Sequence, residues 1–193
     1  MKRVLRFFTV ELKEQPFAPT LAHKLGDVPH VSGLLRRIAQ LSGAGERVAE
    51  WLLKVAIERG ANHYRRDFDA TLPADLPALS DEEIGVALCL GQNPYSLDGL
   101  RVAAQFLSSP RINAERLCRL AVQERCEPVL LHIAEVAQKY APEQEPWAAL
   151  RNQLPPRPVP RTDALPHWSR FVSQTGYTPA GRGRHIEWLV RDE

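Results

Sequence analysis

Two consecutive helical hairpins between residues 80 and 140 restrict the fold of this 193-residue chain more than any other feature of its sequence. The first hairpin begins at Ser80-Asp81-Glu82-Glu83. Serine is a favoured N-cap, and a glutamate three residues later completes a capping box. The apolar spacing then predicts one helix to Leu90 and a second helix from about Ser96 to Leu107, with a Gly- and Pro-containing turn between them.

The second hairpin follows the first at an offset of 33 residues, without a gap. Asn113 is the expected N-cap of a helix to about Arg125, and Pro128 lies in the first turn of a helix to Tyr140, where proline is tolerated. A period of 33 residues is typical of helical-repeat proteins, although any two hairpins of equal length share part of this agreement. The sequence therefore leaves open a short repeat stack and an irregular bundle.

The rest of the chain adds more helix and two strand-like ends. Helical spacing predicts a further hairpin over 30–60 and a short helix over 147–154, while 2–12 and 186–190 have the residues of strands. Pairing the two strands would satisfy their backbone groups. We therefore expect a mainly α fold of packed helical hairpins, with a small β-sheet formed by the N- and C-terminal strands.

The predicted domain organisation follows from a proline-rich stretch that begins at Pro155. Such a sequence forms an extended, semi-rigid connector. We expect a helical domain with its N-terminal strand over 1–154, a connector over 155–166, and a C-terminal appendage over 167–193 that packs back on the N-terminal strand.

Composition indicates a cytoplasmic protein without a membrane segment. No run reaches the ~18 uncharged apolar residues of a membrane span, and charged residues interrupt the N-terminal apolar run before it reaches the length of a signal peptide. The three cysteines, Cys89, Cys118 and Cys126, form no C-x-x-C pair and lie in apolar helical surroundings, as expected of buried thiols in a reducing compartment.

The motifs of metal, nucleotide and hydrolase sites are missing from the sequence, so we expect no metal and no cofactor. His132 and Glu135 would share a helix face, but a bundle site needs ligands from other helices, which favours a simple polar pair. Cys126 would start a helix beside Arg125, a setting that lowers a thiol pKa, although the position equally suits a small capping residue.

Two clusters of polar residues are candidate sites. The first lies in the predicted loop over 61–79 and could hold an anionic ligand or transfer protons, although a solvated loop with local salt bridges explains it as well; its residues are His63, Tyr64, Arg65, Arg66 and Asp67. The second consists of basic residues at the chain ends, near Trp168, Tyr177 and Trp188, and suits phosphate contacts with base stacking; its residues are Lys2, Arg3, Arg6, Arg182, Arg184 and His185.

The charge distribution is uneven. Residues 1–13 and 151–193 each carry a net charge of +3, which leaves −4 for the residues between them in a chain of net charge +2. We expect a non-catalytic helical scaffold that binds a protein partner, because hairpin stacks form extended surfaces and catalytic motifs are missing. The alternatives are a nucleic-acid-associated protein that uses its basic ends, and an enzyme with a site around 63–69.

Overall fold

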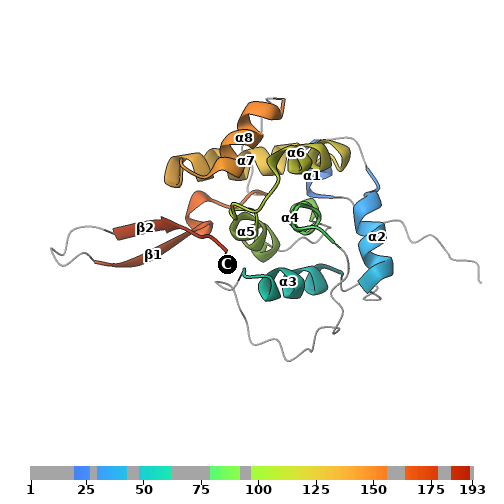
Figure 1. Cartoon of the computed structure of the whole chain (residues 1–193), viewed down its shortest axis with the longest axis horizontal. Coiled ribbons are helices and arrows are strands. Elements are labelled where there is room, and N and C mark those ends of the chain that lie inside the picture. The colour runs from blue at the N-terminus through green and yellow to red at the C-terminus, as the bar shows by residue number, and fades with distance from the viewer. Residues whose placement is uncertain are drawn as a thin grey trace, which may run out of the picture.

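The computed structural model describes residues 20–26, 30–42, 48–61, 79–91, 97–155, 164–177 and 184–191. Within these residues the chain forms eight α-helices, a short 3-10 helix and one two-stranded antiparallel sheet (Figure 1). The expectation of a mainly α fold of packed helices with a small sheet is confirmed. The helices are α1 (Leu21–Lys24), α2 (Gly33–Ser42), α3 (Val48–Glu58), α4 (Asp81–Leu90), α5 (Leu97–Phe106), α6 (Ala114–Gln123), α7 (Glu127–Tyr140), α8 (Glu145–Gln153) and the 3-10 helix η3 (Trp168–Arg170).

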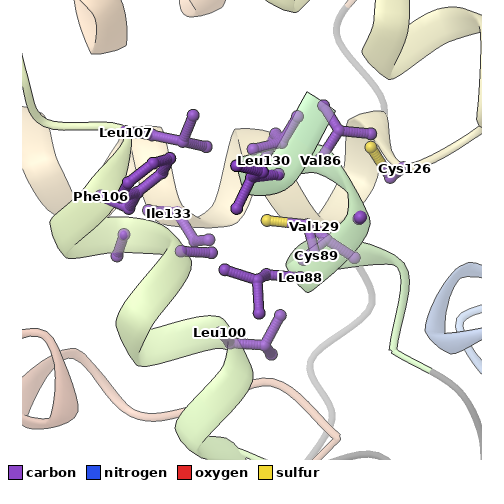
Figure 2. Packing of buried hydrophobic residues seen from close by; sticks show 14 of the residues in the cluster. Val86, Leu88, Cys89, Leu100, Phe106, Leu107, Cys126, Val129, Leu130 and Ile133 are labelled. Carbon is purple, nitrogen blue, oxygen red and sulfur yellow. The ribbon is translucent and has the colours of Figure 1, made fainter. Parts of the chain in front are cut away.

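Helix α4 is the centre of the hydrophobic core. Every residue of this helix from Glu82 to Leu90 is buried, and the helix packs against α3, α5 and α6. Figure 2 shows side chains of α4, among them Leu88 and Cys89, meeting apolar side chains from α5 and α7. Gly85 allows a close approach here, because a Cβ atom at this position would lie 2.3 Å from a methyl carbon of Leu107.

The C-terminal strands form a hairpin that extends away from the helical body (Figure 1). Strand β1 (Val172–Tyr177) pairs with β2 (Arg184–Trp188), and Val172 lies opposite Trp188. The base of the hairpin is buried in the core, where the indoles of Trp188 and Trp147 both donate hydrogen bonds to Ser108 Oγ, at 2.7 and 3.0 Å. The hairpin is therefore anchored to the helical body at this base.

The partner of the C-terminal strand differs from the one expected. The sequence suggested residues 2–12, which lie outside the described residues, whereas the structure pairs 184–188 with 172–177. Just before β1, Trp168–Arg170 form the 3-10 helix η3. The sequence pattern does not predict strand β1, because Val-Ser-Gln-Thr-Gly-Tyr is mostly polar and contains a glycine, so it has no apolar alternation.

The 33-residue offset is visible in one pair of helices. Helix α6 has the bounds of α4 shifted by 33 residues, whereas α7 is longer than α5. Their environments also differ, since α4 is almost wholly buried and α6 buries only Leu117, Cys118 and Ala121. A repeat stack, as opposed to an irregular bundle, stays a prediction.

Candidate functional site

Helix α4 begins with the capping box that its sequence predicts. Ser80 Oγ accepts a hydrogen bond from the Glu83 N–H at 3.3 Å, and Glu83 Oε2 accepts one from the Ser80 N–H at 2.8 Å. These two bonds satisfy backbone donors that a helix start leaves free. The three carboxylates of this first turn, Asp81, Glu82 and Glu83, also bind groups from elsewhere in the chain.

Asp81, the first residue of α4, binds two arginines. Arg59 Nη1 lies 2.8 Å from Asp81 Oδ1, and Arg191 Nη1 lies 2.7 Å from Oδ2. The buried Arg191 guanidinium also lies 4.6 Å from the centroid of the Phe106 ring, at cation–π distance. Burial alone would raise the pKa of Asp81, but the hydrogen bonds and charges of the two arginines outweigh it and lower the pKa. Asp81 therefore stays ionised and fixes the chain beyond β2.

Glu83 and Glu82 bind arginines of two other helices. Arg37 of α2 donates a hydrogen bond to Glu83 Oε1, and Arg116 Nη2 of α6 lies 3.7 Å from the same oxygen. Arg116 Nε also lies 3.8 Å from Glu82 Oε2. Burial would raise the pKa of Glu83, but Arg37, the Ser80 N–H and Arg116 together lower it. The start of α4 thereby joins α2 to α6.

A second link between α2 and α6 runs through Glu124, the residue that ends α6. Its buried carboxylate accepts hydrogen bonds from Ser32 Oγ at 2.7 Å and from the Leu34 N–H at 3.3 Å. The His30 Nε2 atom lies 3.6 Å from the same group. Because these donors stand at the first turn of α2, Glu124 caps that helix from a distance of 90 residues in sequence.

The outward side of α2 and α6 consequently presents guanidinium groups. Over 30–42 and 111–125, the exposed charged side chains are five arginines and one glutamate, because the other carboxylate in these ranges, that of Glu124, is buried. Helix α2 stands at the end of the helical body opposite the hairpin (Figure 1). In the same two ranges three large apolar side chains, Val31, Leu41 and Val122, are 49%, 52% and 51% exposed.

We name this face the α2–α6 surface. Its residues are Val31, Arg36, Arg37, Leu41, Arg116, Arg119 and Val122. None of its arginines belongs to a motif that the sequence makes visible. The capping box predicted only that the Glu83 side chain would turn back to the start of α4.

Most of the sequence-predicted site residues lie outside the described part of the chain. This holds for the whole anion-binding candidate, His63, Tyr64, Arg65, Arg66 and Asp67, and for Lys2, Arg3, Arg6 and Arg182 of the nucleic-acid candidate. The backbone of Arg184 and His185 forms the start of β2. Of the aromatic residues expected beside them, Trp188 is buried in the core and Trp168 is half-buried at its rim.

The expectation that the three cysteines are buried is confirmed, and the structure contradicts the alternative of a reactive thiol at Cys126. Cys126 is fully buried, and burial together with the nearby Cys89, Glu127 and Glu124 raises its pKa well above the usual value. The residue does precede α7, but the core covers it, so the helix start offers the sulfur no access to solvent.

The His132–Glu135 pair forms no metal site. His132 Nε2 donates a hydrogen bond to the Pro166 carbonyl at 3.0 Å, so this ring nitrogen is used inside the fold. Across the ranges that the structure describes, no three histidine, cysteine, aspartate or glutamate side chains are grouped so that they could hold a metal ion. None of the helices in those ranges has both the length and the apolar character needed to cross a membrane.

Comparison with known proteins adds no assignment. No protein-family model matches the chain, and no curated protein or solved structure shows significant similarity to it.

Proposed function

We propose that this chain is a non-catalytic helical scaffold that binds a protein partner through the α2–α6 surface. The observation that carries the proposal is the composition of this surface, which combines exposed arginines with three exposed apolar side chains. Arginine is enriched at protein interfaces, and an apolar centre with a charged rim is their usual anatomy.

The charge of the surface specifies the chemistry of the partner. The surface has four exposed arginines, and Glu115 is the one exposed acidic residue over 30–42 and 111–125, so an acidic segment with a few apolar side chains is complementary to it. The ion pairs beneath hold Arg37 and Arg116 in place before a partner arrives, because both guanidinium groups are already bound to Glu83. This preorganisation lowers the entropy that binding costs.

The carboxylates at the start of α4 support a structural and not a catalytic role. A general acid or base works best when its pKa lies near the operating pH. The pKa values of Asp81 and Glu83 are instead lowered, because arginines bind their ionised forms. The alternative of an enzyme site around 63–69 stays a prediction.

We further propose a cytoplasmic location. All three cysteines, Cys89, Cys118 and Cys126, are free and buried, and unpaired buried thiols are usual in proteins of reducing compartments.

A displayed random peptide library tests the proposed surface. Peptides are selected on the wild-type chain and then tested for binding to the double variant Arg36→Glu/Arg119→Glu, which reverses two exposed charges. A second double variant, Lys139→Glu/Arg170→Glu, reverses the same number of exposed charges elsewhere and serves as the control. We expect acidic peptides with apolar residues that bind the wild type and the control equally. Enrichment of basic peptides, or equal binding to the Arg36→Glu/Arg119→Glu variant, would refute the proposal.

A further inference from the structure

A second surface, independent of the α2–α6 surface, carries a stack of aromatic rings beside exposed cations. At the end of α7 the Tyr140 ring stacks on Trp168, with centroids 5.1 Å apart and planes at 23°. His167 lies against Trp168 at 5.1 Å and 46°, so three rings follow one another. Lys139 Nζ lies 5.4 Å from the centroid of Tyr140. We name Lys139, Tyr140, His167, Trp168 and Arg170 the ring platform.

Hydrogen bonds on both sides hold the ring platform in place. On the N-terminal side of the segment, His132 of α7 binds the Pro166 carbonyl. Within the segment, His167 Nδ1 accepts a hydrogen bond from the Ser169 N–H and so caps η3. After it, Arg101 Nε of α5 donates to the Arg170 carbonyl at 3.1 Å. The segment that carries Trp168 is thus attached to two helices, so its rings are positioned before any ligand binds.

The exposure of the ring platform distinguishes it from the other aromatic contacts. Trp51, Trp147 and Trp188 are 8%, 0% and 3% exposed, whereas Trp168 and Tyr140 are only half-buried. His167, Lys139 and Arg170 are exposed. Lys139 precedes Tyr140 and Arg170 follows Trp168, so exposed cations adjoin the rings in the sequence.

We infer that the ring platform binds single-stranded nucleic acid. A base has two apolar faces that stack on aromatic side chains, and flanking cations bind the phosphates that join successive bases. The exposed His167 ring and the partly exposed Trp168 ring supply the stacking surface, while the exposed Lys139 and Arg170 supply the positive charge. A double helix hides its base faces, so the ring platform selects unpaired strands.

Fluorescence provides a direct test, because one tryptophan of the four is placed to stack on a base. The full-length chain is titrated with fluorescein-labelled 12-nucleotide oligouridylate and oligothymidylate, and anisotropy and intrinsic tryptophan emission are recorded. A duplex of the same length is the control for strandedness. We expect single strands to bind at low salt and to quench part of the tryptophan emission. The comparison of RNA with DNA shows which sugar is preferred.

Variants assign the binding to the ring platform. We expect Trp168→Ala to weaken binding about tenfold and to abolish the quenching, since base stacking on one aromatic residue is typically of this size. Trp168→Phe should retain most of the affinity while losing the quenching, which shows that stacking and not folding is responsible. Lys139→Glu/Arg170→Glu should weaken binding and reduce the slope of log affinity against log salt by about 0.7 for each phosphate that the variant no longer neutralises.

Several results would overturn the inference. These are the absence of single-strand binding at about 50 mM salt, equal binding of duplex, or an affinity that Trp168→Ala leaves unchanged in a chain with normal circular dichroism. Binding of acidic peptides to the ring platform in place of oligonucleotides would also overturn it. The variant Arg36→Glu/Arg119→Glu should bind oligonucleotides like the wild type, so failure of the α2–α6 surface and failure of the ring platform are distinguishable.

Discussion

Replacing Arg191 with alanine should cost this fold more stability than the loss of almost any other charge. The side chain is 3% exposed, binds Asp81 Oδ2 at 2.7 Å and Ser109 Oγ at 3.2 Å, and lies over the Phe106 ring. Removing one partner of a buried ion pair typically costs ~3–5 kcal/mol. Asp81 is 26% exposed and keeps Arg59, which reduces the loss, so we expect about 2–3 kcal/mol.

Urea unfolding followed by circular dichroism measures this loss. The matched control is Arg119→Ala, because Arg119 and its partner Glu115 are 73% and 74% exposed and 3.9 Å apart. Such a surface pair contributes about 0.5 kcal/mol or less. If the two variants were equally stable within ~0.5 kcal/mol, Arg191 would not anchor the C-terminal segment and the reasoning would be wrong.

Acid should reduce the difference in unfolding free energy between the wild type and Arg191→Ala. The pKa of Asp81 is lower in the folded chain than in the unfolded chain, so its ionised form stabilises the fold fully above pH ~4. This contribution is lost as the pH falls through the folded pKa, and the variant has less of it to lose. A difference in unfolding free energy that stayed constant from pH 7 to pH 3 would contradict the assignment.

Three further predictions concern the core. Ser108→Ala leaves two buried indole N–H groups without their acceptor and should cost about 2–4 kcal/mol in the same unfolding assay, whereas a loss below ~0.5 would contradict the shared hydrogen bond. Gly85→Ala should lower the free energy of unfolding by about 1–3 kcal/mol, because the new methyl group overlaps Leu107. The control Gly33→Ala, where a Cβ atom meets no atom within 4 Å, should be neutral or stabilising. A larger loss of stability for Gly33→Ala than for Gly85→Ala would refute this packing. Alkylation of Cys126 at pH 8, followed by mass spectrometry, should be on the order of a hundredfold slower in the folded than in the urea-unfolded chain, and comparable rates would show that the thiol is accessible.

Local signals in the sequence predicted the helices well. The capping box at Ser80 and the cap at Asn113 place α4 and α6 correctly, since N-caps depend on residues three or four positions apart. The strand at the C-terminus was also expected, within two residues of β2. What these signals could not give was the partner of each element, and so the hairpin of β1 and β2 was missed.

The candidate surfaces depend on contacts that no local pattern contains. Arg191 and Asp81 are separated by 110 residues, and Ser32 and Glu124 by 92. A carboxylate at a helix start indicates a favourable dipole, but not which arginine will bind it. Likewise, Trp168 and Trp188 are the same residue type, yet the core buries Trp188 and leaves Trp168 at its rim. Tertiary packing, and not residue type, determines that Trp188 is part of the core while Trp168 is accessible to a ligand.

The central claim, that the α2–α6 surface binds an acidic protein segment, is tested most directly by calorimetric titration. An acidic peptide selected on the wild-type chain is titrated into the wild type, Arg36→Glu/Arg119→Glu and the control Lys139→Glu/Arg170→Glu, at about 50 and 300 mM salt. We predict an affinity at least about tenfold lower for the first variant, an unchanged affinity for the control, and weaker binding at the higher salt. Equal affinity for the wild type and the Arg36→Glu/Arg119→Glu variant would contradict the claim.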